Sequence, residues 1–159
     1  MLKITVKNLQ DKTLISSLMI KNLIKRILKE ERIKAKGEIT VSIVTDPLIK
    51  KLNQAYCKKN IPTDVLAFNS SEHFNKENLF ADIVVSVDTA RYNSKIYATS
   101  LLKELKLYIA HGLLHLLGYN HNTPLKKGAM QRKERKYADN LSRGNRIKKK
   151  RFQGDLFNS

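Results

Sequence analysis

The sequence contains a single cysteine, Cys57, among its 159 residues. One cysteine excludes a disulfide within the chain, and such a composition suits a reducing compartment. The first six residues, MLKITV, alternate apolar and polar side chains and lack the apolar segment of a secretory signal. We therefore expect a cytoplasmic protein.

Long uninterrupted apolar runs are also missing. The most apolar stretch, residues 101–117, is interrupted by charged and histidine side chains, which are Lys103, Glu104, Lys106, His111 and His115. A helix that crosses a bilayer needs about 20 consecutive, mostly apolar residues. We interpret residues 101–117 as a buried helix and predict no membrane-spanning segment.

Acidic residues are scarce, because 14 Asp and Glu stand against 31 Lys and Arg, for a formal net charge of +17. A surplus of this size indicates a polyanionic partner, nucleic acid first and an anionic membrane surface second. A charge surplus that serves only solubility is the alternative.

Residues 143–159 include the basic run 146–151, which has no apolar periodicity. We expect this segment to be a flexible tail that either contacts phosphates or stays solvated.

The spacing of apolar residues predicts the elements of one domain. Alternation or short apolar runs predict strands at residues 2–7, 38–44, 63–68 and 81–87. Helical spacing predicts helices at residues 11–32, 46–56, 88–98, 100–117 and 123–141. The helix at 100–117 is apolar around most of its circumference, so we expect it at the centre of the domain.

Three of the four histidines lie within residues 111–121. His111 and His115 are four positions apart, so on a helix they share one face. Gly118 is suited to end this helix, because glycine adopts the left-handed conformation easily. A turn there brings His121 back toward the other two. Three neutral imidazoles with a fourth position open to water describe a catalytic zinc site; the alternative is two core histidines and one exposed loop histidine.

The histidine spacing is also that of a long zinc-protease signature, in which glutamate follows the first histidine as general base. Here that position is Gly112, which has no side chain. The pattern therefore favours another kind of metal hydrolase, or a metal site without catalysis. His73 stands apart from the other histidines, and we expect it at the surface.

The stretch HGLLHLLGYNH at residues 111–121 resembles the signature of the YbeY family, the bacterial rRNA maturation factors. PTDVLAF at residues 62–68 resembles the second motif of that family, and Asp82-Ile83-Val84 with Ser86 resembles the third. Further positions also fit, namely Leu52-Asn53, Tyr56, Met130 and Glu134. The resemblance extends from about Leu2 to Leu141, over most of the chain.

This resemblance implies an α+β fold in a single domain, residues 1–142. It implies a mostly parallel mixed sheet of about four strands packed with helices, the central one carrying two of the histidines. It also implies a zinc-type ion, Zn²⁺ or another transition metal, on His111, His115 and His121. The implied activity is metal-dependent cleavage of single-stranded RNA, in maturation of the 16S rRNA 3′ end and in ribosome quality control. The implied partners are rRNA and the small ribosomal subunit, with no small-molecule cofactor.

Several positions depart from the family pattern, among them Ala67, Asn69 and Ala81, and two others bear most directly on catalysis. Asn120 stands where the family usually has Asp, and an amide cannot accept a proton as a base. Cys57 stands where an Arg is usual, so a phosphate contact is lost there. Lys58 and Lys59 follow directly, and we expect them to bind the RNA backbone as point charges. We expect metal binding to persist and catalysis to be reduced.

Metal-assisted hydrolysis of RNA is the leading functional hypothesis. Asp64 and Asp82 are candidates for outer partners that orient metal ligands, or else for caps of strand ends. Tyr119 is a candidate for stacking on an unpaired base, or else a packed aromatic. A non-catalytic RNA- or ribosome-binding assembly factor with a structural metal is the second hypothesis. A metalloprotease is disfavoured by Gly112.

Overall fold

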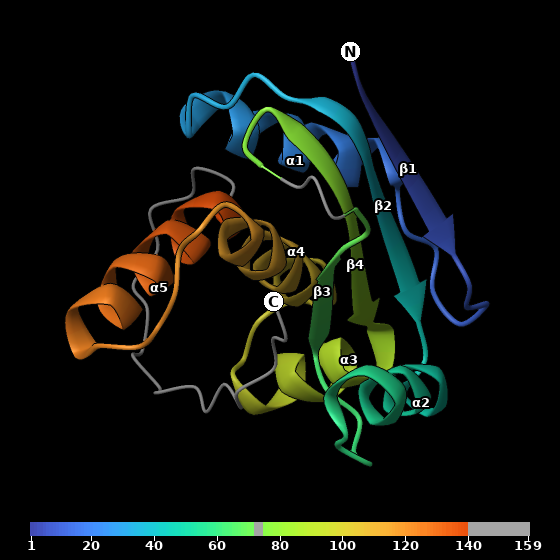
Figure 1. The fold of residues 1–159 in the computed structure, drawn as a ribbon. Coiled ribbons are helices and arrows are strands. Elements are labelled where there is room, and N and C mark those ends of the chain that lie inside the picture. Colours follow the sequence, from blue (N-terminus) through green and yellow to red (C-terminus); the bar gives the residue numbers. More distant parts are fainter. Residues whose placement is uncertain (72–74, 140–159) are drawn as a thin grey trace.

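The structure is a computed structural model, and it describes residues 1–71 and 75–139. In chain order the elements are β1 (Leu2–Asn8), α1 (Ser17–Glu30), β2 (Lys36–Val44), α2 (Asp46–Cys57), β3 (Val65–Asn69), β4 (Asn78–Ser86), α3 (Val87–Ile96), α4 (Leu101–Leu116) and α5 (Pro124–Ala138). The sheet has the order β1-β2-β4-β3, with β1, β2 and β4 parallel and β3 antiparallel to β4. The predicted α+β fold with a mostly parallel mixed sheet is confirmed (Figure 1).

Several element boundaries differ from the sequence prediction, among them the starts of α1 and β4. Helix α1 begins at Ser17, not near residue 11. The preceding turn is held by Gln10, whose side-chain amide donates to the Thr13 carbonyl at 2.6 Å and accepts from the Thr13 N–H at 3.0 Å. Strand β4 begins at Asn78, because it pairs with the start of β2 at Lys36. The predicted tail 143–159 and His73 lie outside the described residues.

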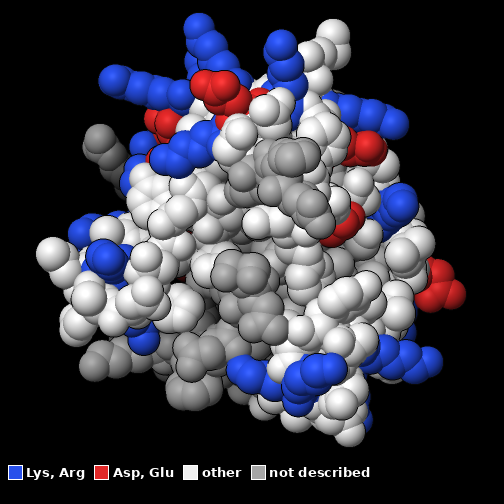
Figure 2. Space-filling model, in the orientation of Figure 1, with Lys and Arg blue, Asp and Glu red and all other residues white. Residues whose placement is uncertain are grey.

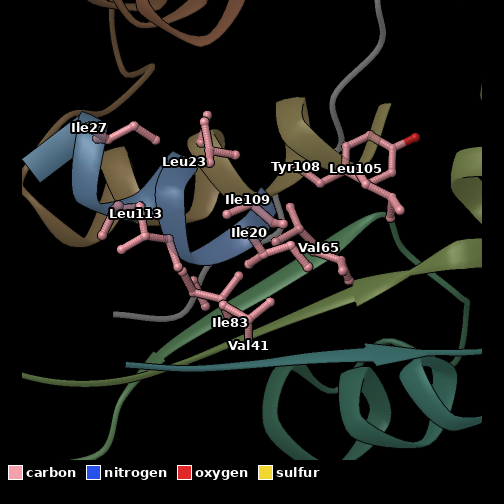
Figure 3. Close-up of a cluster of buried hydrophobic side chains, with 14 of the residues drawn as sticks. Ile20, Leu23, Ile27, Val41, Val65, Ile83, Leu105, Tyr108, Ile109 and Leu113 are labelled. Atoms are coloured by element: carbon pink, nitrogen blue, oxygen red, sulfur yellow. The ribbon is translucent and has the colours of Figure 1, made fainter. Parts of the chain in front are cut away.

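Helices α1 and α4 cover one face of the sheet. Figure 3 shows side chains of α1 and α4 meeting those of β2, β3 and β4 at Val41, Val65 and Ile83. Helix α2 packs on the opposite face, where a smaller cluster contains Ile49 and Leu66. Every residue of α4 from Glu104 to Leu114 is buried, so the prediction of a buried central helix is confirmed.

Gly112 lets α4 approach the sheet closely. A Cβ at this position would lie 3.3 Å from methyl groups of Val65 on β3 and Ile83 on β4, and 3.5 Å from the Ala67 Cβ. A glutamate at position 112 would therefore enter the interface between helix and sheet. The structure thus supplies a packing reason for glycine at the position where a zinc protease carries its general base.

The end of α4 forms the turn that the sequence predicts at Gly118. Gly118 has a φ of +104°. Its N–H donates to the His115 carbonyl at 3.0 Å, and the Tyr119 N–H donates to the Leu114 carbonyl at 3.1 Å. This is the Schellman pattern of helix ends, and it reverses the chain toward His121.

A carboxylate at the end of α1 holds this exit turn. Glu31, directly after α1, accepts hydrogen bonds from the Tyr119 hydroxyl at 2.7 Å, the Tyr137 hydroxyl at 2.6 Å and the Lys133 ammonium at 2.8 Å. The Lys133 Nζ also lies 5.2 Å from the centre of the Tyr119 ring. One side chain therefore ties α1 to α5 and to the turn that precedes His121.

No helix within residues 1–71 and 75–139 has both the length and the apolar character needed to cross a bilayer.

Replacing Gly112 tests the close packing of α4. We expect Gly112→Leu to lower the free energy of unfolding by about 2 kcal/mol, because the new side chain overpacks the interface with β3 and β4. Gly128→Ala in α5 is the matched control, since only the flexible Arg132 guanidinium lies near its Cβ position, at 3.4 Å. That control should gain about 0.5–1 kcal/mol from helix propensity. Urea unfolding measures both; a Gly112→Leu protein as stable as the parent would contradict the close packing.

Replacing Glu31 tests the anchor of the exit turn. Burial raises the pKa of the Glu31 carboxyl, but hydrogen bonds from Lys133, Tyr137 and Tyr119 outweigh it, so the net pKa is lowered from 4.5. A lowered pKa in the folded state stabilises the fold above the unfolded-state pKa, and this stabilisation disappears as the pH falls through the folded-state pKa. We expect Glu31→Gln to cost about 2 kcal/mol at neutral pH, and this difference should shrink in acid.

Glu30→Gln is the matched control for Glu31→Gln. Glu30 forms ion pairs at the surface with Arg26 at 3.2 Å and Lys136 at 2.7 Å. Its replacement should cost no more than about 0.5 kcal/mol, because exposed pairs contribute little. Equal costs for the two variants in urea unfolding followed by circular dichroism would rule out a special role for Glu31.

Candidate metal centre

His111 lies on the buried face of α4 and has a carboxylate partner. Its side chain is 5% exposed, as is that of Glu134 from α5. The Glu134 Oε1 atom contacts the His111 Nδ1 atom. This is the arrangement in which a carboxylate orients a histidine that binds a metal through its other ring nitrogen.

His121 reaches the same region from the loop after the exit turn. The ring centres of His111 and His121 are 6.4 Å apart, and their planes differ by 27°. Two imidazoles on one zinc ion have ring centres roughly 5 Å apart, given Zn–N distances of about 2.0–2.1 Å. Within the described part of the chain, no set of three His, Cys, Asp or Glu side chains is already gathered for a metal ion. His111 and His121 therefore lie near each other without forming a closed ligand set with a third side chain among the described residues.

His115 lies one turn after His111 on α4, and both other histidines affect its pKa. Burial lowers the pKa of His115, and the nearby His111 and His121 lower it further, while a backbone hydrogen bond with Tyr119 opposes the shift. The three imidazoles therefore interact electrostatically. A lowered pKa keeps His115 neutral at pH 7, and neutral imidazole is the form that binds metals.

Asn120 shapes the loop that carries His121. Its side-chain oxygen accepts a hydrogen bond from the Asn122 N–H at 3.1 Å. Such a side-chain to backbone bond two residues on stabilises a turn. Asn120 therefore contributes local structure next to the third histidine, which an amide oxygen can do as well as a carboxylate.

Asp64 lies beside the histidines, at the start of β3. Burial raises the pKa of its carboxyl, whereas the charge of His111 and hydrogen bonds from the Val65 N–H and the Thr63 hydroxyl lower it. The Val65 N–H donates at 2.8 Å. Asp64 thus caps the start of β3, as the structural alternative expects, and its role as an outer partner that orients a metal ligand stays a prediction.

Asp82 lies on the face of the sheet opposite α4, so it does not orient a metal ligand. Its neighbour Ile83 points toward α4, so Asp82 points to the opposite face. There, burial raises its pKa, Lys7 lowers it and Glu38 raises it. The hypothesis that Asp82 orients a metal ligand was therefore wrong, because neighbouring residues of a strand face opposite ways.

Lys58 and Lys59 lie in the exposed loop after α2. Lys58 ends the helix in the left-handed conformation, with a φ of 59°. The Lys59 N–H donates to the Asn53 carbonyl at 3.3 Å. The loop continues to Asp64, which interacts with His111. Cys57, which stands in place of the usual Arg, packs against the small cluster under α2.

Sequence reasoning missed two functional contacts. The sequence identified Glu134 only as a position that fits the family pattern, because no local pattern connects it with His111, which is 23 residues away. Its one signal was an acidic residue in an otherwise basic helix. The contact between Glu31 and Tyr119 was also missed, since it joins residues 88 positions apart. Because the Tyr119 hydroxyl is bonded and its ring packs against the core, the packed alternative holds for this residue.

Comparison with known proteins agrees with this arrangement. The family described as Endoribonuclease YbeY matches residues 5–142. Endoribonuclease YbeY of Syntrophus aciditrophicus is 38% identical over 136 residues, which cover 82% of this chain and 84% of that protein. The Aquifex aeolicus protein of the same name is 40% identical over 103 residues, 65% of this chain and 66% of that protein.

A solved structure shows the same fold. The solution structure of a Thermotoga maritima protein is 29% identical to this chain and covers 87% of both chains, with a TM-score of 0.58. Sequence motifs, the family match over residues 5–142 and the shared fold all lead to one assignment. This chain belongs to the YbeY endoribonuclease family.

Proposed function

We propose that this chain hydrolyses phosphodiester bonds in single-stranded RNA with a metal ion held by His111, His115 and His121. Membership of the family makes it an endoribonuclease, a hydrolytic nuclease. The observation that supports the metal site best is the contact of the Glu134 carboxylate with His111 Nδ1. A buried carboxylate that fixes one nitrogen of a histidine directs the other toward a ligand.

The residues of the chain divide the work between orientation and binding. Glu134 fixes the ring of His111, and the rigid helix sets His115 one turn further on. The turn at Gly118 and the bond from Asn122 to Asn120 bring His121 alongside. A bound Zn²⁺ ion supplies a water with a pKa near 7 and polarises a phosphoryl oxygen. Lys58 and Lys59 would hold the RNA backbone by their charge.

The proposed substrate is rRNA, at the 3′ end of 16S rRNA, and the proposed partner is the small ribosomal subunit, in the cytoplasm. The family assignment supports this role, and so does the net charge of +17. A surplus of positive charge attracts polyanions from solution and strengthens contacts with phosphates. Imidazole ligands favour Zn²⁺ but also accept other transition metals.

Removing one histidine tests catalysis by the metal site. We expect the parent to cleave single-stranded RNA, to lose activity with a chelator and to recover it with Zn²⁺. His115→Ala should stay at the level of the chelated parent, because one ligand is missing. His73→Ala, which changes the one histidine outside residues 111–121, should cleave like the parent. Equal cleavage by His115→Ala and the parent would refute the proposal, and RNA binding without any cleavage by the parent would favour a non-catalytic assembly factor.

Replacing Glu134 tests the orientation of His111 without relying on activity. Glu134→Gln should weaken Zn²⁺ affinity by about 10–100-fold, because partners of ligating histidines contribute this much. Glu77→Gln, at an exposed position before β4, is the control and should bind Zn²⁺ like the parent. Titration calorimetry measures the affinity, and thermal melts of the metal-free proteins check folding. Unchanged affinity in a folded Glu134→Gln protein would contradict this assignment.

A further inference from the structure

A groove beside the end of α1 combines an apolar floor with a basic rim. Its volume is about 630 Å³, and it is lined by Leu2, Leu28, Ile33 and Ala35 and by Lys25, Lys29, Arg32 and Lys34. Resting on the proposed function, we propose that this groove is a second contact surface for the single-stranded RNA that is cleaved at the histidines. The rim contacts phosphates, and the floor accepts unstacked bases.

Among the described residues, the four cations of the rim take no part in the ion pairs that stabilise the fold. Within the described residues, none of the four rim side chains forms a hydrogen bond or an ion pair. The cations between α1 and α5 behave differently, because Arg26 of α1 and Lys136 of α5 pair with Glu30, and Lys133 of α5 pairs with Glu31. Like charges gathered without partners repel one another, and a polyanion removes that cost.

The backbone at Arg32 adds an independent observation. Helix α1 ends in the same hydrogen-bond pattern as α4, with the Arg32 N–H on the Lys29 carbonyl at 3.1 Å and the Ile33 N–H on the Leu28 carbonyl at 2.8 Å. Helix α4 uses glycine in the left-handed position of this turn, whereas α1 uses Arg32, with a φ of 58°. A side chain there costs roughly 1–2 kcal/mol. This turn places Arg32 at the end of α1, among the other cations of the rim.

A second hollow adjoins the groove and borders the turn that precedes His121. It has a volume of about 290 Å³ and is lined by Glu31, Ile33, Lys76, Leu117, Gly118 and Tyr119. Ile33 belongs to both hollows, and Gly118 and Tyr119 form the turn that leads to His121. Figure 2 shows Lys and Arg side chains projecting at the upper left, over the end of α1 and the start of β2. The two hollows therefore adjoin at Ile33, and Lys76 adds a further cation between the basic rim and the turn before His121.

The chemistry of the groove favours RNA over an acidic protein segment. Single-stranded RNA presents phosphates at regular intervals together with planar bases that stack on or pack against apolar surfaces. The groove offers both kinds of contact within one surface. Apart from the four cations, the side chains that line the groove are apolar and cannot form hydrogen bonds with bases. We therefore expect binding without strong sequence preference.

Neutralising two rim lysines tests this surface. Lys25→Gln/Lys29→Gln is compared with Lys50→Gln/Lys51→Gln, because all four lysines are exposed on helices and the control pair lies on α2. Binding of single-stranded oligouridylate to the full chain is measured with a chelator present, over a series of salt concentrations. Loss of two phosphate contacts should reduce the slope of log affinity against log salt by about 1.4, since each contact in single strands contributes about 0.7.

We expect the Kd of Lys25→Gln/Lys29→Gln for oligouridylate to rise several-fold and the control pair to change less. Equal changes in Kd and slope for the two pairs would overturn the groove as an RNA surface. Stronger displacement of the RNA by polyglutamate than by unlabelled oligouridylate would overturn RNA as the occupant. Because binding is measured without cleavage, a parent that binds with this slope but never cleaves would refute the proposed function and leave the groove standing.

Discussion

Helix α4 packs so tightly on the sheet that a Cβ at Gly112 would come within 3.3 Å of Val65 and Ile83. This close approach buries the middle of the helix and holds His111 where Glu134 reaches it from α5. A flexible element could not keep two imidazoles and a buried carboxylate in register. Close packing of the helix on β3 and β4 is thus the constraint on which the candidate metal centre depends.

The third histidine is positioned by polar contacts outside the apolar core. His121 lies beyond the end of α4, where backbone hydrogen bonds of Gly118 and Tyr119 reverse the chain. Glu31 then fixes that direction through Tyr119 and joins it to α5 through Tyr137 and Lys133. Helix α5 supplies both the residues that hold Glu31 and the carboxylate that holds His111, so the two parts of the site share one support.

The positive charge of this chain is divided between two tasks. Some cations stabilise the contact of α1 with α5, where Glu30 and Glu31 neutralise them. Others line an apolar groove and have no acidic partner within the described residues. Net charge alone could not separate these groups, because it counts both equally. This separation is the basis of the proposal that the groove binds RNA.

The strands, the helices, the buried character of α4 and the turn at Gly118 could all be predicted from local patterns, because each depends on the spacing of residues close together in the chain. The same spacing placed His111 and His115 on one helix. Only the tertiary structure decided which face of the sheet Asp82 occupies, and which carboxylates hold His111 and Tyr119. These contacts join residues as far apart as 88 positions, so they follow from how the helices pack and not from any local pattern.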